Sequence, residues 1–304
     1  MTNPRVSVIV VNWNGQEHLG RCLLSLIECG SDSIDRIIVV DNGSTDGSAE
    51  LARKLAGVTV LEAGENLGFA KACNLGARAA NADFLLFLNP DAAIGPGVLQ
   101  RALAFMTGAE SAAVGICGVQ LVDEEGKIAR SCARFPTPFG MCLVALGIGR
   151  IFPASGMLME DWSHHDSREV DHVIGAFYFV RRIVFEKLGG FDERFFMYLE
   201  DLDFSSRARR LGWRSHYLAD VRAFHAGGGS SRQVKDRRLF YSLRSRVLYS
   251  SKHFDRLSAG LVFLLTVAIE PIVRIAWSAA SLSWPTVKQT LSAYRMLYEW
   301  IRTK

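Results

Sequence analysis

The sequence predicts an α/β protein with a mostly parallel sheet flanked by helices and a helical tail at its C-terminal end. Three observations support this fold class. Apolar runs rich in Val and Ile alternate with helix-like stretches over the first hundred residues. Short polar loops separate these segments, and from residue 234 onward the pattern is helical. The chain of 304 residues is 49% hydrophobic and 22% charged, which is typical of a globular protein.

The first half of the chain contains four expected strands. They are continuous apolar runs, as expected for parallel strands covered on both faces, and they lie at residues 6–11, 36–40, 58–63 and 84–88. Between them, Leu19, Leu23 and Leu26 have helical spacing, and Ser44 begins a run of capping residues. The expected helices lie within residues 15–29, within 44–55 after the capping residues at its start, and within 68–80. This alternation predicts right-handed crossovers between parallel strands.

The second half of the chain is less regular. A turn at DEEGK makes residues 119–131 a candidate hairpin. Residues 172–182 are expected to form a strand, and 183–193 a short helix that ends at a glycine pair. Residues 200–213 have acids in the first turn and arginines in the last, which suits the helix macrodipole. One or two further strands are expected at 214–225.

Charge and cysteine content exclude some classes of protein. The net charge of +4 is small and no base-reading motif accompanies the basic residues, so nucleic acid is not an expected partner. Residues 232–256 nevertheless hold eight Lys and Arg against two Asp. The six cysteines include no C-x-x-C pair, which is typical of reduced thiols. With no recognisable signal peptide, we expect a cytoplasmic protein.

Polar side chains follow each of the first four expected strands. They are Asn12 to Asn14, Asp41 to Ser44, Glu65 and Asn66, and Asn89 to Asp91. In an open parallel sheet, ligands bind beyond the carboxyl ends of the strands. One such loop would be ordinary turn chemistry, but four on one edge predict a pocket. The sequence contains no G-x-G-x-x-G string, so a dinucleotide site is not expected.

Six ordered segments carry a resemblance to a known enzyme family: VSVIVVNWNG, VVDNGSTDGS, ENLGFAKACNLGA, LFLNPDA, residues 175–213 and FHAGGGSS. Over about residues 5–250 they resemble the inverting GT-A glycosyltransferases of family 2, most closely the bacterial rhamnosyltransferase-like branch. The resemblance implies the GT-A fold with its Rossmann-like sheet. It also implies a catalytic domain at 1–233, with a nucleotide-sugar-binding half at 1–115 and an acceptor-binding half at 116–233, and a C-terminal segment at 234–304.

The resemblance implies a divalent metal, Mg²⁺ or Mn²⁺, that neutralises the departing diphosphate. The family holds it with a D-x-D motif after the fourth strand, and the last Asp of that motif matches Asp91. Asn89 stands where the first Asp would be, so this site has one carboxylate fewer. His225 corresponds to a histidine that completes the metal or diphosphate site. On the residues alone, an ordinary strand histidine is the favoured interpretation of His225, and the resemblance makes the two interpretations equally good.

The same resemblance implies a nucleotide site made of strand ends and the loops beside them. Trp13 would stack on the base, and Asp41 or Asn42 would hydrogen-bond the pyrimidine edge. The residues assigned to the nucleotide-sugar site are Val11, Trp13, Asp41, Asn42, Asn66, Lys71, Asn89 and Asp91.

Two acids at the start of the expected helix 200–213 are the candidate catalytic residues. An inverting transfer needs a base that takes the proton of the attacking acceptor hydroxyl. The resemblance assigns that role to Asp201, and Glu200 would contact the acceptor or a supporting loop. Acids at this position are also explained as complements of the helix dipole.

The expected function is therefore a metal-dependent inverting transfer of a sugar from a nucleotide diphosphate donor to a glycan or lipid-linked saccharide. Within the resemblance, rhamnose from dTDP-rhamnose is the favoured donor. A sugar-phosphate nucleotidyltransferase is an alternative, but it would carry a glycine-rich basic loop where this chain has VNWNGQEH. A non-catalytic GT-A-like carbohydrate-binding or scaffold protein is the other alternative, and the retained acids and His225 argue against it.

The tail contains two apolar stretches, at 257–269 and 272–284, with Glu270 and Pro271 between them. We expect these two residues to interrupt the apolar run, which leaves each half shorter than the roughly 20 residues that span a bilayer. A tilted or re-entrant pair of segments is an alternative. A helical hairpin packed on the core or on a second subunit of a homodimer is one interpretation. The basic run, with Trp277 and Trp284, favours peripheral attachment to the inner face of the cytoplasmic membrane.

Overall fold

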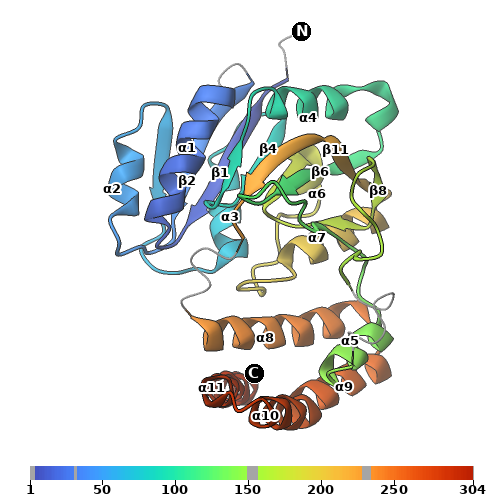
Figure 1. Cartoon of the computed structure of the whole chain (residues 1–304). Helices are drawn as coiled ribbons and strands as arrows, with labels where there is room; N and C mark the ends of the chain where they lie inside the picture. Colours follow the sequence, from blue (N-terminus) through green and yellow to red (C-terminus); the bar gives the residue numbers. More distant parts are fainter. Residues whose placement is uncertain (1–3, 31–32, 149–156, 228–233, 304) are drawn as a thin grey trace.

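The computed structural model describes residues 4–30, 33–148, 157–227 and 234–303. Figure 1 shows a central sheet covered by helices on both faces, with the C-terminal helices in a separate layer next to it. The main sheet has nine strands in the order β3-β2-β1-β4-β10-β6-β11-β5, and β8 pairs with β11 beside this path. The α/β fold class predicted from the sequence is confirmed.

The first half of the sheet is parallel, as predicted. Its strands are β1 (Val6–Asn12), β2 (Ile34–Asp41), β3 (Val58–Glu62) and β4 (Phe84–Leu88). Every residue of β1 and β4 is buried, which explains why their sequences are continuous apolar runs. The crossover helices are α1 (Gln16–Gly30), α2 (Ser48–Arg53) and α3 (Phe69–Arg78). The second helix begins at Ser48, after the polar residues 44–47, as predicted.

The second half makes the sheet mixed. β10 (Phe177–Arg181) lies antiparallel between β4 and β6 (Val114–Val122). β11 (Arg214–His225) is parallel to β6 but antiparallel to β5 (Ala92–Ile94) and β8 (Arg168–Val170). The remaining helices of this half are α4 (Val98–Thr107), η1 (Ala109–Ser111), α5 (Pro138–Ala145), α6 (Arg182–Lys187) and α7 (Glu200–Arg210).

Two expectations for this half are wrong. The chain turns at Asp123, but β6 pairs with β10 and β11, and the expected hairpin is reduced to an isolated bridge between Val122 and Ile128. The single strand expected at 172–182 is divided into β9 (His172–Val173) and β10. β9 pairs with β7 (Cys132–Ala133) in a separate two-stranded sheet. This break turns β9 toward the cavity described below.

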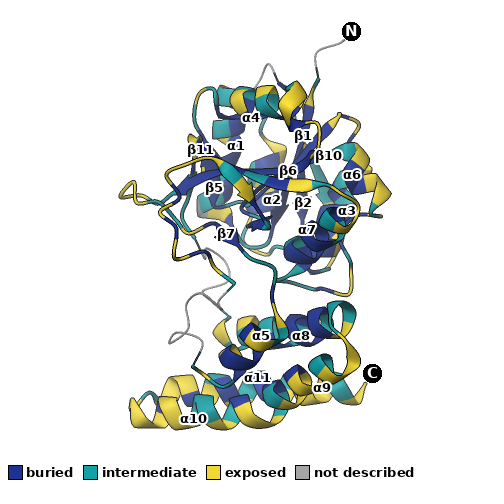
Figure 2. Cartoon of the chain, turned by 90° about the vertical axis from the view of Figure 1, so that its right-hand side faces the viewer, coloured by how far each residue is buried: buried dark blue, intermediate teal, exposed yellow. Residues whose placement is uncertain are grey.

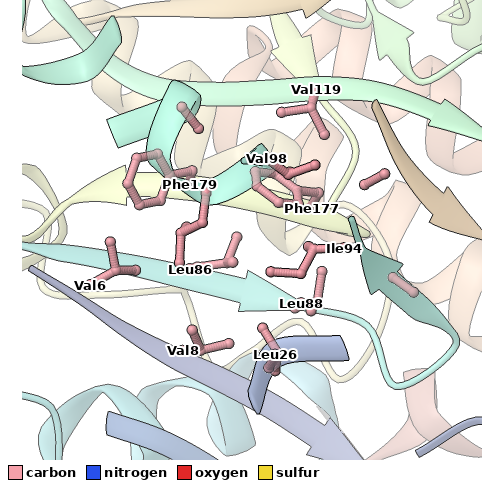
Figure 3. Close-up of a cluster of buried hydrophobic side chains, with 14 of the residues drawn as sticks. Val6, Val8, Leu26, Leu86, Leu88, Ile94, Val98, Val119, Phe177 and Phe179 are labelled. Atoms are coloured by element: carbon pink, nitrogen blue, oxygen red, sulfur yellow. The ribbon is translucent and has the colours of Figure 1, made fainter. Parts of the chain in front are cut away.

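Two hydrophobic clusters cover the two faces of the main sheet. One contains residues of α1 and α4, and the other contains residues of α3, α6 and α7. Figure 3 shows part of the first cluster, in which Leu86 and Leu88 of β4 lie among Val8, Phe177 and Phe179 of the neighbouring strands. Burying apolar area on both faces fixes the strand ends, and therefore the polar loops that follow them.

The tail is built from α8 (Lys235–His253), α9 (Arg256–Leu264), η5 (Leu265–Ile269), α10 (Glu270–Ala280) and α11 (Trp284–Arg302). The expectation that each half is too short to span a bilayer is wrong, because the helix is continuous from Arg256 to Ala280. The π-helical turn η5 changes the hydrogen-bond register just before Pro271, so the missing N–H of proline is tolerated at the start of α10. These 25 residues are long and apolar enough to cross a membrane, judged by length and composition alone.

The tail packs on the part of the chain that contains the sheet, and on itself. Phe195 and Leu202 lie in one cluster with Tyr249 of α8 and Val262 of α9. Glu270, which is buried, pairs with Arg246 of α8 and with Arg274. Removing one partner from a buried ion pair is costly, so this contact fastens the long helix to α8.

Candidate active site

A cavity of about 570 Å³ lies beyond the carboxyl ends of β1 and β4. Its wall continues along β9, the start of α7 and the first turn of α8. The residues predicted for the site that line it are Val11, Trp13, Asn66, Asn89, Asp91, Glu200, Asp201 and His225. Residues from distant parts of the sequence therefore meet in one place, as the sequence predicted for the strand ends.

Asp41, Asn42 and Lys71 are not on the cavity wall. Asp41 accepts hydrogen bonds from the Asn12 side chain and from the backbone N–H of Ser44. Asn42 donates to Asn66 Oδ1 at 3.1 Å and accepts from the backbone N–H of Leu67 at 2.8 Å. These two residues hold neighbouring loops together, and their contact with a nucleotide stays a prediction. Lys71 is exposed on α3.

Asp91 and His225 form the first polar pair in the cavity. Pairing of β5 with β11 brings them together, and the backbone N–H of Ala226 donates to Asp91 O. His225 Nε2 lies 3.3 Å from Asp91 Oδ1. This nitrogen is buried and has no hydrogen-bond partner among the described residues. A buried polar atom without a hydrogen-bond partner lowers the stability of the fold, unless a bound ligand supplies the partner.

This pair fits a hard divalent cation. Two neighbouring ligands at about 2.1 Å from an octahedral Mg²⁺ are about 3 Å apart, close to the separation of Asp91 Oδ1 and His225 Nε2. Across the described ranges, no group of three or more His, Cys, Asp and Glu that could hold a metal occurs. A cation here would therefore depend on oxygen atoms of the substrate, as Mg²⁺ commonly does with phosphates.

The start of α7 forms the other polar part of the cavity. Tyr198 and Leu199 both have left-handed backbone angles, with φ of 68° and 63°. This conformation is rare for bulky residues, and here it turns the chain so that Glu200 and Asp201 line the cavity. The third acid, Asp203, points instead toward α8 and pairs with Lys252 and His253.

Asp201 is held by backbone donors. Its Oδ2 accepts from the N–H of Gly175 at 2.7 Å, and its Oδ1 accepts from the N–H of Leu202 at 2.8 Å. A Cβ at position 175 would lie 3.0 Å from Oδ2, so only glycine leaves the carboxylate room in this position. The break between β9 and β10 therefore positions Asp201.

Glu200 and Asp201 have opposite pKa shifts. Burial, followed by the charge of Asp201, raises the pKa of Glu200 well above its ordinary value. Burial also opposes ionisation of Asp201, but the charge and hydrogen bond of His172 and the N–H groups of Gly175 and Leu202 outweigh it and lower the pKa. At neutral pH this arrangement favours an ionised Asp201 beside a neutral Glu200.

The sequence analysis missed several polar residues on the cavity wall, among them His172, Arg237 and Arg238. His172 lies in β9, and nothing in HVIGAF distinguished it from an ordinary strand histidine. The arginines lie in the first turn of α8, where Tyr241 stacks on Phe196 with ring centroids 4.4 Å apart. The basic run around residue 237 was a signal for an anion, but the fold was needed to bring it to the cavity.

Comparison with known proteins identifies the family. The model of the family described as glycosyl transferase family 2 matches residues 7–189, which is more than half of the chain. The chain belongs to glycosyl transferase family 2. This glycosyltransferase is 31% identical over 232 residues to the N-acetylglucosaminyl-diphospho-decaprenol L-rhamnosyltransferase of Mycobacterium tuberculosis H37Rv, covering 72% of this chain and 75% of the relative.

A second relative of this family 2 glycosyltransferase is the rhamnosyltransferase WbbL of Escherichia coli K12. It is 26% identical over 271 residues, covering 84% of this chain and 98% of the relative. Among solved structures, the mannosyltransferase PcManGT of Pyrobaculum calidifontis, in complex with GDP-Man and Mn²⁺, has a TM-score of 0.56 at 19% identity. That similarity covers 100% of this chain and 83% of the other. These likenesses confirm the GT-A fold, the family and an enzyme that transfers a sugar.

Proposed function

We propose that this glycosyltransferase moves rhamnose from dTDP-rhamnose to a hydroxyl of a lipid-linked saccharide, with inversion at the anomeric carbon and with a divalent metal. The observation that carries the proposal is that the Asp91–His225 pair and an ionised Asp201 line the same cavity. The Asp91–His225 pair suits a cation and the diphosphate that it binds. The ionised Asp201 can accept a proton. The rhamnosyl donor is inferred from the two rhamnosyltransferase relatives.

Asp91 and His225 would hold the cation, and Asn89 also lines this cavity. When bound, the metal would neutralise charge on the departing diphosphate. Trp13 and Val11 line the cavity at the end of β1, where a base can stack. We assign the donor site to residues 1–115 and the acceptor site to residues 116–233, and α8 of the segment 234–304 adds to the acceptor end.

Asp201 is the base in this proposal. Its carboxylate takes the proton of the acceptor hydroxyl as the hydroxyl oxygen bonds to the anomeric carbon. The bond from that carbon to the diphosphate oxygen breaks, and the diphosphate leaves with the electron pair. A positioned base of this kind typically contributes about 10²–10⁴-fold in rate. Glu200, in its neutral form, is a hydrogen-bond donor available to the acceptor sugar.

The acceptor end of the cavity suits a lipid diphosphate. Arg237 and Arg238 supply positive charge, and neither makes an ion pair with a residue in the described ranges. The neighbouring wall is apolar and contains Leu158, Leu199 and Tyr241. The name of the M. tuberculosis relative specifies a diphospho-decaprenol acceptor, which has both chemical features.

A lipid-linked acceptor lies in a membrane, so we also propose that the tail attaches the protein to that membrane. Large apolar side chains are exposed on α9, α10 and the turn before α11; Leu257 is 86% exposed, Leu282 81% and Trp277 69%. Figure 2 shows this exposure along α9 and α10, on the side of the tail away from the sheet. Because Glu270 fastens α10 to α8, we propose that the long helix lies on the inner membrane surface and does not cross it.

Vesicle flotation tests the attachment. Full-length protein should float with vesicles that contain anionic phospholipid and less with neutral ones, since each basic residue near the surface adds about 1 kcal/mol. Changing Leu257 and Trp277 to Ser should abolish flotation. If protein stays soluble with both vesicles and light scattering gives a dimer, the apolar face is a subunit interface instead.

The transfer itself is tested with a panel of nucleotide sugars and a short-chain N-acetylglucosaminyl diphospholipid in Mg²⁺. Mass spectrometry should show the lipid gaining one deoxyhexose only when dTDP-rhamnose is present. Transfer from a UDP-sugar alone would overturn the donor. Formation of a nucleotide sugar from a sugar 1-phosphate, without transfer, would favour a nucleotidyltransferase, and binding without turnover would favour a carbohydrate-binding protein.

A further inference from the structure

We propose that His172 is a positioning residue for the base, holding Oδ2 of Asp201 through Nε2. The inference rests on the proposed function in one respect, that Asp201 accepts the proton of the acceptor. His172 itself is not required to touch the reacting atoms.

The geometry places His172 between Asp201 and a buried hydroxyl pair. His172 is 2% exposed, and its Nε2 lies 3.5 Å from Asp201 Oδ2. Its Nδ1 lies 2.9 Å from Ser205 Oγ, which is 2.7 Å from the hydroxyl of Tyr178. The Tyr178 hydroxyl in turn lies 3.2 Å from the backbone oxygen of Asp201. The chain of contacts thus begins and ends at the base.

Two arrangements of hydrogens satisfy these contacts. If Tyr178 donates to Asp201 O, Ser205 donates to Tyr178 and His172 Nδ1–H donates to Ser205. If Tyr178 donates to Ser205, Ser205 donates to His172 Nδ1. In both arrangements, a hydrogen on Nε2 makes the contact between His172 and the Asp201 carboxylate favourable.

The charged and titratable groups around Asp201 come from several elements: Glu200 and Asp203 of α7, Tyr178 of β10, Cys73 of α3, His172 of β9, and Arg237 and Arg238 of α8 across the cavity. Burial opposes ionisation of Asp201. Among these groups, His172 contributes most to lowering its pKa. Without His172, we expect the pKa of Asp201 to rise, and the base to lose its ionised form as pH falls.

Two amide variants, H172Q and H172N, test the roles of the two nitrogens of His172 separately. The amide N–H of Gln is placed to replace Nε2 and donate to Asp201 without charge, whereas the amide of Asn is placed to replace Nδ1 and reaches only Ser205. If holding Asp201 is what matters, H172Q should retain more activity than H172N. If His172 only stabilises the fold, the order should follow the thermal stability of the two variants.

The experiment is steady-state transfer by full-length protein with Mg²⁺, measured between about pH 5 and pH 8. We expect H172N to lower kcat about 100-fold with KM for donor and acceptor nearly unchanged, because a misplaced group costs rate and not ground-state binding. H172Q should lose less. In both variants, activity should begin to fall at a higher pH than in the wild type as pH is lowered.

His164 offers a matched control. It is also buried, and its Nδ1 contacts Trp162 O at 3.0 Å, but it does not line the cavity. H164Q should lower the melting temperature without moving the pH profile. A pH profile of H172N that superimposes on the wild type, with a normal kcat, would overturn the proposal. If D201N also transfers at a normal rate, the assignment of the base has failed; if only D201N is impaired, the failure belongs to His172 alone.

Discussion

The two polar parts of the cavity differ in how complete they are. At the donor side, His225 Nε2 is buried beside Asp91 and has no hydrogen-bond partner among the described residues. At the base side, both oxygens of Asp201 accept backbone hydrogen bonds, and His172 adds a third contact. The proposed donor side therefore has a buried nitrogen that a ligand could bind, whereas the proposed base is already held by protein hydrogen bonds. The predictions below test that difference.

The largest expected effect is at the donor side. Asp91→Ala removes the only carboxylate of the proposed metal pair, so transfer should be abolished and calorimetric titration should show donor affinity falling at least tenfold in Mg²⁺. Removing the metal with EDTA should have the same effect on the wild type. Glu125→Ala, in an exposed loop, is the control and should leave transfer and donor affinity unchanged. Full activity in EDTA would contradict the account of the donor side.

Gly175→Ala tests whether the base side is preassembled. The added Cβ would lie 3.0 Å from Asp201 Oδ2, which forces the carboxylate to shift by a few tenths of an ångström. We expect kcat to fall about tenfold, with donor affinity unchanged, because only the base is displaced. An equal loss of donor binding would show that the two sides are not separable.

A smaller effect is expected for the arginines of α8. Changing Arg237 and Arg238 to Gln should raise KM about tenfold for a diphospholipid acceptor and leave KM for a neutral alkyl glycoside unchanged, since charged hydrogen bonds are lost only with the first. The control is Arg182→Gln, which does not line the cavity. Equal effects on both acceptors would remove the arginines from acceptor recognition. An increase in donor KM alone would assign them to the donor diphosphate.

The smallest effect on rate is expected for Glu200→Gln. If Glu200 is already neutral, the amide replaces it with a change in kcat of less than about threefold. Stability should change more than rate. The folded pKa of Glu200 lies above its unfolded value near 4.3, so ionisation costs stability as pH rises above that value. The variant should melt at a higher temperature than wild type at pH 7 but not at pH 4.

Local patterns in the sequence were enough for the first half of the fold. Continuous apolar runs predicted β1, β2 and β4 because these strands are buried on both faces and are therefore apolar at successive positions. β3 lies at the edge of the sheet and has no fully buried residue, and it was predicted from its β-branched residues. The hairpin expected at 119–131 failed because β6 pairs with strands more than fifty residues away. The division of the tail into two short halves failed because the partner of Glu270 is Arg246 on another helix, which the sequence alone does not reveal.

The candidate site was predicted unevenly for the same reason. Asp91, Asp201 and His225 came from motifs whose spacing matched a family, and the fold brings all three to one cavity. His172 was missed because its role depends on Ser205 and Asp201, which only the folded chain places beside it. Residues that belong to a motif can be recognised from the sequence, whereas a residue that only positions them, such as His172, cannot.

The central claim is that donor binding and proton acceptance belong to separate, differently prepared parts of one cavity. Asp201→Asn tests it most directly, since it keeps the size of the side chain and removes the base. We measure transfer at saturating dTDP-rhamnose in Mg²⁺, with donor affinity determined by calorimetry on the same preparation. The account predicts a fall in kcat of about 10²–10⁴-fold with donor affinity near that of the wild type. Transfer at the wild-type rate would contradict it.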